Sequence, residues 1–254
     1  MALLPIPSPK ERKEKPWFIS GWSNPERATM TAKALEMTCI PKKVGMDSGS
    51  GFKAKPLRKF PADHVIFEYS VHFPDDFNWV KGGKLPGLGL GPGDDAATGS
   101  DWQDALGSVR VMWREQGQGI AYLYLPLEIA KDGTRDGTIK VQGKAFEDAA
   151  EGSLGKHAGI DVFFKNRAGL QFSKGQWNTV RIQVKLNTPG KSDGFFELTI
   201  NDETRRVDNV IFRKSKDIRI NLALVVAFFG GSTLEWAAKK KETLSFKDFN
   251  ITCP

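Results

Sequence analysis

A two-residue alternation of apolar and polar side chains constrains this chain most, because only a β-strand turns such a pattern into two chemically different faces. The alternation is clearest in Leu106–Pro126, which predicts two strands joined by a loop that holds Gly117 and Gly119. The odd-numbered positions of both strands are apolar and are predicted to face a core: Val109, Val111, Trp113, Ala121, Leu123 and Leu125.

The even-numbered positions of the same two strands carry functional groups. If Arg114 pairs with Ile120 across the loop, Arg110 lies opposite Tyr124. A one-residue shift in this register would turn the apolar set of one strand outward, so burial disfavours it. An ordinary solvent-facing sheet surface with tyrosines as good strand formers is the alternative interpretation. The hairpin is predicted to gather a hydroxyl, a guanidinium and two phenols on one face: Ser108, Arg110, Tyr122 and Tyr124.

The rest of the chain predicts an all-β fold. Turn-forming residues separate the strand-like runs, and no strand–helix–strand alternation is present. We therefore expect an antiparallel β-sandwich or β-jelly roll in which one curved sheet forms a cleft. The glycine-rich segment Gly82–Gly93 is interpreted as a loop that crosses the sheet edge and carries Lys84. The further predicted strands are Trp17–Trp22, Thr29–Ile40, His64–Phe73, Ile160–Phe164, Thr179–Leu186, Phe195–Ile200, Arg205–Phe212, Ile218–Phe229 and Leu244–Ile251.

Length and composition fit one large domain. The chain has 254 residues, of which 40% are hydrophobic, and this is enough for a sizeable core. Residues 1–16 are rich in proline and charge and are predicted to be a linker-like segment without a secretion signal. Residues 17–254 are predicted to form a single domain. Cys39 and Cys253 are too few for a disulfide framework. They could pair if the first and last strands are neighbours, and two free thiols are the other expectation.

The charge balance indicates an anionic partner. The chain carries 37 basic and 30 acidic residues, a net charge of +7, which suits nucleic acid, a membrane surface or an acidic polysaccharide. No apolar run approaches the roughly 20 residues of a membrane span. Tyrosines beside an arginine could stack on single-stranded nucleic acid, but the basic residues are dispersed and no nucleic-acid-binding motif is present. The sign of the charge alone does not choose among these partners; the chemistry and the resemblance described below favour a monomer that binds an acidic polysaccharide, with no nucleic-acid or membrane partner.

Several common catalytic centres are disfavoured. Three histidines and two distant cysteines give no zinc-ligand spacing, and no GxSxG elbow is present. The Gly82–Gly93 segment lacks the GK[ST] of a phosphate-binding loop, and prolines interrupt any dinucleotide fingerprint. The acidic positions do not follow the order of a calcium loop and are interpreted as a solvated loop: Asp94, Asp95, Asp101 and Asp104. No cofactor and no metal are predicted.

The remaining residues suit β-elimination on a uronic-acid polymer. That reaction needs a group that neutralises the carboxylate next to C5, a base for the C5 proton and an acid for the departing O4. An arginine suits the first role because it pairs with a carboxylate through two hydrogen bonds. Tyrosine and lysine have ordinary pKa values of about 10 and 10.4, which neighbouring cations lower toward the working pH.

At these residues the sequence resembles polysaccharide lyase family 14, the alginate and glucuronate lyases of algal viruses and molluscs. The matching pieces are GGKLPGL with Lys84, SVR with Ser108 and Arg110, and YLY with Tyr122 and Tyr124. The segment FFGGSTLEWAA, Phe228–Ala238, also resembles the family, and the resemblance extends from Phe60 to Ile251.

The resemblance implies a β-jelly roll with a basic cleft and metal-independent elimination, and it is closer to the viral, glucuronate-directed members. It implies catalytic roles for Lys84, Arg110, Tyr122 and Tyr124 and substrate binding by Ser108. The expected substrate is a glucuronate-rich acidic cell-wall polysaccharide outside the cell, with alginate as a second substrate. The alternative is a non-catalytic module that binds an anionic polysaccharide.

Overall fold

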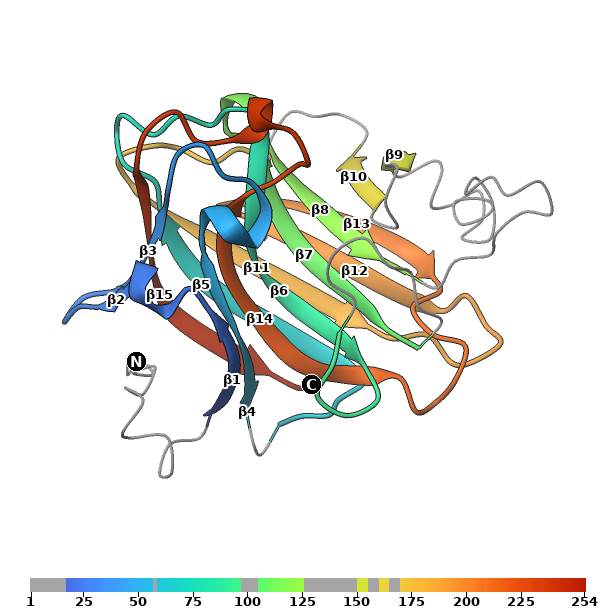
Figure 1. The fold of residues 1–254 in the computed structure, drawn as a ribbon. Coiled ribbons are helices and arrows are strands. Elements are labelled where there is room, and N and C mark those ends of the chain that lie inside the picture. Colours follow the sequence, from blue (N-terminus) through green and yellow to red (C-terminus); the bar gives the residue numbers. More distant parts are fainter. Residues whose placement is uncertain (1–16, 57–58, 97–104, 126–149, 155–159, 165–169) are drawn as a thin grey trace.

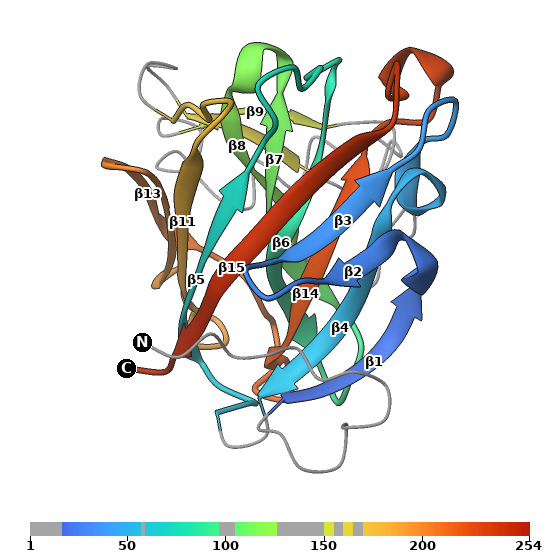
Figure 2. The same cartoon turned by 90° about the vertical axis from the view of Figure 1, so that its left-hand side faces the viewer.

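The computed structural model describes residues 17–56, 59–96, 105–125, 150–154, 160–164 and 170–254. In these residues the regular structure consists of β-strands and short 3-10 helices. The strands form two antiparallel sheets that pack face to face without closing into a barrel, as Figures 1 and 2 show. The predicted all-β sandwich is therefore confirmed.

The larger sheet, sheet A, has eight strands and carries the predicted hairpin. Its strands bend along their length in Figure 1. In spatial order they are β1 (Trp17–Ser23), β4 (Ser50–Pro56), β14 (Arg219–Phe229), β6 (Gly82–Gly91), β7 (Gly107–Arg114), β8 (Gly119–Tyr124), β10 (Ile160–Phe164) and β9 (Ala150–Leu154).

The smaller sheet, sheet B, has seven strands. In spatial order they are β13 (Glu203–Val210), β12 (Gly194–Ile200), β11 (Trp177–Lys185), β5 (His64–His72), β15 (Glu242–Thr252), β3 (Leu35–Cys39) and β2 (Ala28–Met30). In the described part of the chain, four 3-10 helices lie between strands: η1 (Pro25–Arg27), η2 (Gly45–Ser48), η3 (Glu115–Gly117) and η4 (Leu234–Trp236). None of the described helices is long and apolar enough to cross a bilayer.

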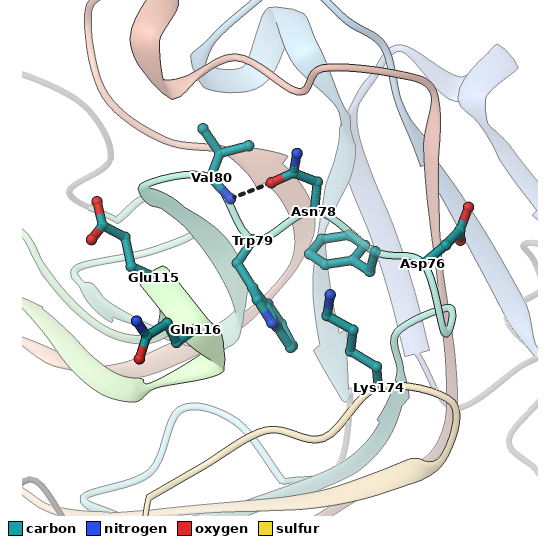
Figure 3. Close-up of a pocket in the computed structure, with 8 residues that line it drawn as sticks. Asp76, Asn78, Trp79, Val80, Glu115, Gln116 and Lys174 are labelled. Atoms are coloured by element: carbon teal, nitrogen blue, oxygen red, sulfur yellow. Dashed lines mark hydrogen bonds between the residues drawn. The ribbon is translucent and has the colours of Figure 1, made fainter.

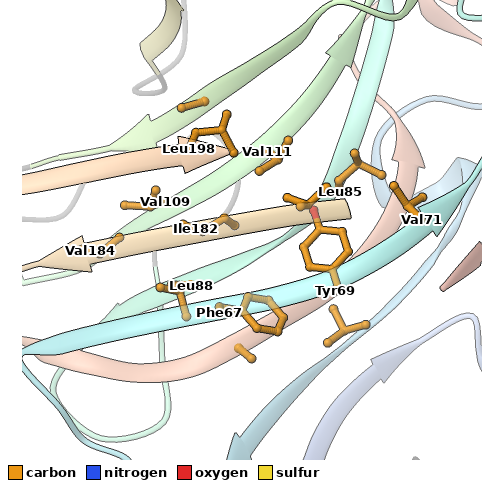
Figure 4. Close-up of a cluster of buried hydrophobic side chains, with 14 of the residues drawn as sticks. Phe67, Tyr69, Val71, Leu85, Leu88, Val109, Val111, Ile182, Val184 and Leu198 are labelled. Carbon is orange, nitrogen blue, oxygen red and sulfur yellow. The ribbon is translucent and has the colours of Figure 1, made fainter. Parts of the chain in front are cut away.

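The hydrophobic core fills the space between the two sheets (Figure 4). The odd-numbered side chains of β7 and β8 point into it as predicted, and β5 contributes its alternate residues from the other sheet. The hydroxyl of Tyr69 on β5 lies in this core and donates a hydrogen bond to the carbonyl oxygen of Pro86 at 3.2 Å. Each sheet therefore has one face that packs and one face left for other chemistry.

The glycine-rich segment is a central strand, and the prediction of an edge-crossing loop is wrong. It forms β6, which is buried throughout and pairs with β14 on one side and β7 on the other. A Cβ atom at Gly83 would lie 2.2 Å from the ring of Trp113, so the missing side chain is what lets the core indole pack there. Pro86 lies in the register shift between Lys84 and Gly87, where a residue without an N–H is tolerated.

The predicted strand Thr29–Ile40 is also wrong, because it is the hairpin β2–β3. The backbone N–H of Thr31 donates to the carbonyl oxygen of Ala34 at 2.9 Å, and the Thr31 hydroxyl accepts the N–H of Ala34 at 3.1 Å. A side chain that binds the backbone in this way stabilises a turn in place of a continuous strand.

The two cysteines are free thiols. Strands β3 and β15 are neighbours, but their antiparallel register places Cys39 opposite Glu242, at the start of β15. Cys253 follows the other end of β15, so the two thiols lie at opposite ends of the strand. The predicted linker-like segment 1–16 lies outside the described residues.

Candidate functional site

The β7–β8 hairpin brings the predicted residues together with a register that differs from the prediction. Ser108 pairs with Tyr124 and Arg110 with Tyr122, a shift of two residues from the expected Arg110–Tyr124 pair. The loop is tighter than expected, because the N–H of Arg114 donates to the carbonyl oxygen of Gln118 at 2.7 Å. A shift of two residues leaves every side chain on its original face, so the predicted faces are retained.

Strand β6 brings the amine of Lys84 to the same face. Lys84 pairs with Met112 across β6 and β7, and its Nζ atom lies 2.7 Å from the Met112 sulfur. The same Nζ lies 2.7 Å from the centroid of the Tyr122 ring. Lysine, arginine, serine and both tyrosines therefore form one group of side chains, which we call the Arg110 cluster: Lys84, Ser108, Arg110, Tyr122 and Tyr124.

The cluster is more enclosed than the floor of an open groove. Ser108 is 0% exposed and Arg110 is 3% exposed, and Lys84 and Tyr124 are also buried. The side chains cover one another: the guanidinium of Arg110 lies 5.4 Å from the Tyr124 ring, and the two tyrosine rings meet edge to face at 5.4 Å. This mutual packing excludes water, and charges interact more strongly there than at an open surface.

Arg110 is electrostatically unusual. Its Nε atom is buried and has no hydrogen-bond partner, and none of the ion pairs among the described residues involves it. Burial lowers the pKa of Arg110, and the neighbouring Tyr124 and Tyr122 oppose that shift. Arginine nevertheless stays protonated in proteins. A buried cation without a carboxylate is unfavourable in the free protein, and it forms a ready site for an anion.

A second buried arginine shows how the fold satisfies such a group elsewhere. Arg213 donates to the carboxylate of Asp63 at 2.8 Å and to the carbonyl oxygens of Asn187 and Ile218, each at 2.9 Å. Arg213 and Arg110 are both buried, at 6% and 3% exposure. Of the two, only Arg213 pairs with a carboxylate of the described residues.

Other candidate centres do not assemble. Within the described ranges no three His, Cys, Asp or Glu side chains are grouped as metal ligands. Asp94 and Asp95 instead make ion pairs with Lys55 and Lys53, at 2.6 and 2.9 Å. The other two acidic positions considered, Asp101 and Asp104, lie outside the described residues.

A hollow of about 430 Å³ lies apart from the Arg110 cluster, at the η3 end of the sandwich. Figure 3 shows Trp79 at its centre, with Lys174 on one side and Glu115 and Gln116 on the other. None of the cluster residues lines it.

The structure adds two residues that sequence reasoning did not single out. Met112 contacts Lys84, and Gly87 faces Arg110 so closely that a Cβ there would lie 2.8 Å from the Arg110 Cγ. The sequence could have indicated Met112, because it occupies an even-numbered position of β7 and so shares a face with Arg110. It could not have indicated Gly87, because only the order of strands in the sheet shows that Gly87 lies beside Arg110.

Comparisons with known proteins agree on one family. The sequence model of Polysaccharide lyase 14 matches residues 23–249. A curated relative, exolysin from Paramecium bursaria Chlorella virus 1, is 26% identical over 187 residues. That match covers 68% of this chain and 26% of the relative, so the chain spans about a quarter of the relative's length.

Two solved structures share the fold. The marine PL-14 alginate lyase from Aplysia kurodai superimposes with a TM-score of 0.78 at 24% identity, over 96% of this chain and 92% of that one. The alginate lyase vAL-1 from Chlorella virus has a TM-score of 0.74 at 22% identity, over 94% and 93% of the two chains. With the family model matching nearly the whole described sandwich, the chain belongs to the polysaccharide lyase 14 family.

Proposed function

We propose that this protein is a lyase that cleaves a glucuronate-containing acidic polysaccharide by β-elimination, without a metal ion. The reaction leaves a 4,5-unsaturated uronate at the new non-reducing end. The observation that carries the proposal is the buried guanidinium of Arg110, whose Nε atom has no hydrogen-bond partner and which forms no ion pair with the carboxylates of the described residues. The substrate would supply a carboxylate.

Arg110 would bind the carboxylate of the uronate whose C5 proton is removed. A bidentate guanidinium–carboxylate pair withdraws charge from the carboxylate and stabilises the enolate-like anion that forms when the proton leaves. Its enclosure at 3% exposure strengthens this interaction, because little water screens it.

The phenols and the amine would move the protons. Tyr122 or Tyr124 would take the C5 proton as a phenolate and a phenol or ammonium would protonate the departing O4. The Lys84 amine lies 2.7 Å from the centre of the Tyr122 ring, so a positive charge is next to the reacting phenol. Lys84 can also share the role of base, and Ser108 would orient the sugar. No step requires a metal, because two side-chain cations supply the positive charge.

The substrate assignment rests on charge and on the relatives. A net charge of +7 favours a polyanion. The two fold relatives are named alginate lyases, so alginate is the second candidate substrate beside glucuronan. We propose further that residues 17–254 act as one catalytic domain, as a monomer, on wall polysaccharide outside the cell.

The test is ultraviolet absorbance of the conjugated product, with glucuronan, polymannuronate and polyguluronate as substrates. We expect absorbance to rise on glucuronan first, equally with and without a chelator, and to rise about 10²–10³-fold more slowly with Arg110→Met. Failure of every polyuronide to give absorbance at any pH would end the lyase proposal. Retention on immobilised polymer without cleavage, unchanged in Tyr122→Phe, would instead indicate a binding module.

A further inference from the structure

The row of functional side chains on β7 continues past the Arg110 cluster. Arg114 is the last residue of β7 and has the same parity as Arg110 and Met112, so it lies on the same face of sheet A. At about 3.3 Å per residue, the Cα atoms of Arg110 and Arg114 are roughly 13 Å apart. Arg114 is less buried than Arg110. The second arginine therefore lies where the cluster approaches solvent.

A chain of contacts joins Arg114 to the cluster. Met112, which contacts Lys84, also borders Gly230: a Cβ there would lie 3.5 Å from the Met112 Cε and 3.7 Å from the ring of Trp236. The guanidinium carbon of Arg114 lies 5.1 Å from the centroid of the same ring. Met112, Gly230 and Trp236 thus lie in a row between Lys84 and Arg114.

Trp236 packs on the backbone of its own loop next to Arg114. It ends η4, which lies at the same end of the sandwich as η3 in Figures 1 and 2. Gly231 has a φ of 75°, and a Cβ there would lie 2.1 Å from the indole, so the ring packs directly on the backbone. On the other side, a Cβ at Gly82 would lie 3.1 Å from the Arg114 Cδ. Two glycines make room for the pair.

An arginine stacked on an aromatic ring keeps the in-plane N–H donors with which it binds a carboxylate. A polyuronate carries a carboxylate on every sugar, so a chain bound at Arg110 presents further carboxylates along its length. We propose that Arg114, positioned by Trp236, forms a distal subsite that binds the carboxylate of another uronate of the same chain. This inference rests on the proposed function, because it requires a polyuronate in the Arg110 cluster.

The proposal makes the effect of Arg114 depend on substrate length. Only a chain long enough to reach both arginines gains from the second contact. The contact is made equally before and during the reaction, so it lowers KM without changing kcat. Loss of one such charge-assisted pair should raise KM about tenfold on polymer. The shortest oligosaccharide that is cleaved should show no change.

The experiment compares Arg114→Met, Arg114→Lys, Trp236→Leu and wild type on glucuronan and on purified oligosaccharides of graded length. We expect Arg114→Met to raise KM on polymer only. Arg114→Lys should raise it less, and the KM of Trp236→Leu should lie between those of the two Arg114 variants. Arg206→Met is the matched control, because Arg206 stacks on Phe195 at 3.6 Å on sheet B and its loss removes the same charge. It should match wild type at every length.

An equal change at every length, or a polymer KM unchanged in Arg114→Met, would overturn the subsite. If wild type gives no unsaturated product on any polyuronide, the lyase proposal fails, and retention in polyuronate gels then tests the subsite separately. In that assay Arg114→Met should migrate faster than Arg206→Met. Equal retention of the two variants would rule the subsite out.

Discussion

Replacing Arg110 with methionine should remove activity while leaving the fold at least as stable. The buried Nε atom makes no hydrogen bond, and an unsatisfied buried donor costs about 1–3 kcal/mol. Methionine reaches as far as the arginine Nε, has no N–H donor, and adapts to irregular spaces. Exchanging a buried charge for an apolar group is often neutral or stabilising. We expect the free energy of unfolding to be unchanged or to rise by about 1 kcal/mol.

Activity should respond in the opposite direction. Removing one preorganised donor from a developing anion typically lowers kcat by about 10²–10³, equal to about 3–4 kcal/mol of transition-state stabilisation. Arg110 would contribute a full charge in a site that excludes water, so the upper end of that range is expected. The combination of lost activity and retained stability is characteristic of a residue kept for function.

Arg213→Met is the control of equal burial. It removes hydrogen bonds to Asp63, Asn187 and Ile218 and leaves two buried carbonyl oxygens without donors. We expect it to lower the free energy of unfolding by about 2–4 kcal/mol. Urea unfolding with a common m-value gives both changes, and ultraviolet absorbance on glucuronan gives kcat. A loss of stability in Arg110→Met as large as in Arg213→Met, or a kcat near that of wild type, would refute the reasoning.

Three further predictions concern the interior. Burial raises the pKa of Glu242, so the folded state favours the protonated carboxyl group. The stability gained from this protonation is fully present below the ordinary pKa of 4.5 and is lost as pH rises through the raised pKa. Glu242→Gln should therefore flatten the fall in stability measured by urea unfolding from acid to neutral pH, and an unchanged slope would contradict this. Burial raises the pKa of Cys39 to about 12, so a thiol reagent should label Cys253 in the native protein and reach Cys39 only on unfolding. Gly83→Ala would place a Cβ 2.2 Å from a core indole and should lower the free energy of unfolding by about 2 kcal/mol or more, seen as a lower urea midpoint; a wild-type midpoint would show that the ring can move.

The strands with clear alternation could be predicted from sequence, and so could the face that each side chain occupies. Parity along a strand is a local property: a polar residue between two apolar ones points away from the core wherever the strand pairs. This is why Ser108, Arg110, Tyr122 and Tyr124 were assigned correctly to one face. The pairing offset is not local, because a two-residue shift preserves every face and changes only which residues are opposite. The observed Arg110–Tyr122 pair depends on the tight η3 turn.

Strand β6 was beyond sequence reasoning for a related reason. A segment of alternating glycines has weak β-propensity, and it becomes a strand only because β14 and β7 approach from both sides and leave no room for side chains. The place of Lys84 over the Tyr122 ring follows from the order β6–β7–β8 in the sheet. Periodicity in the chain decides what faces inward, and packing between distant segments decides which functional groups become neighbours.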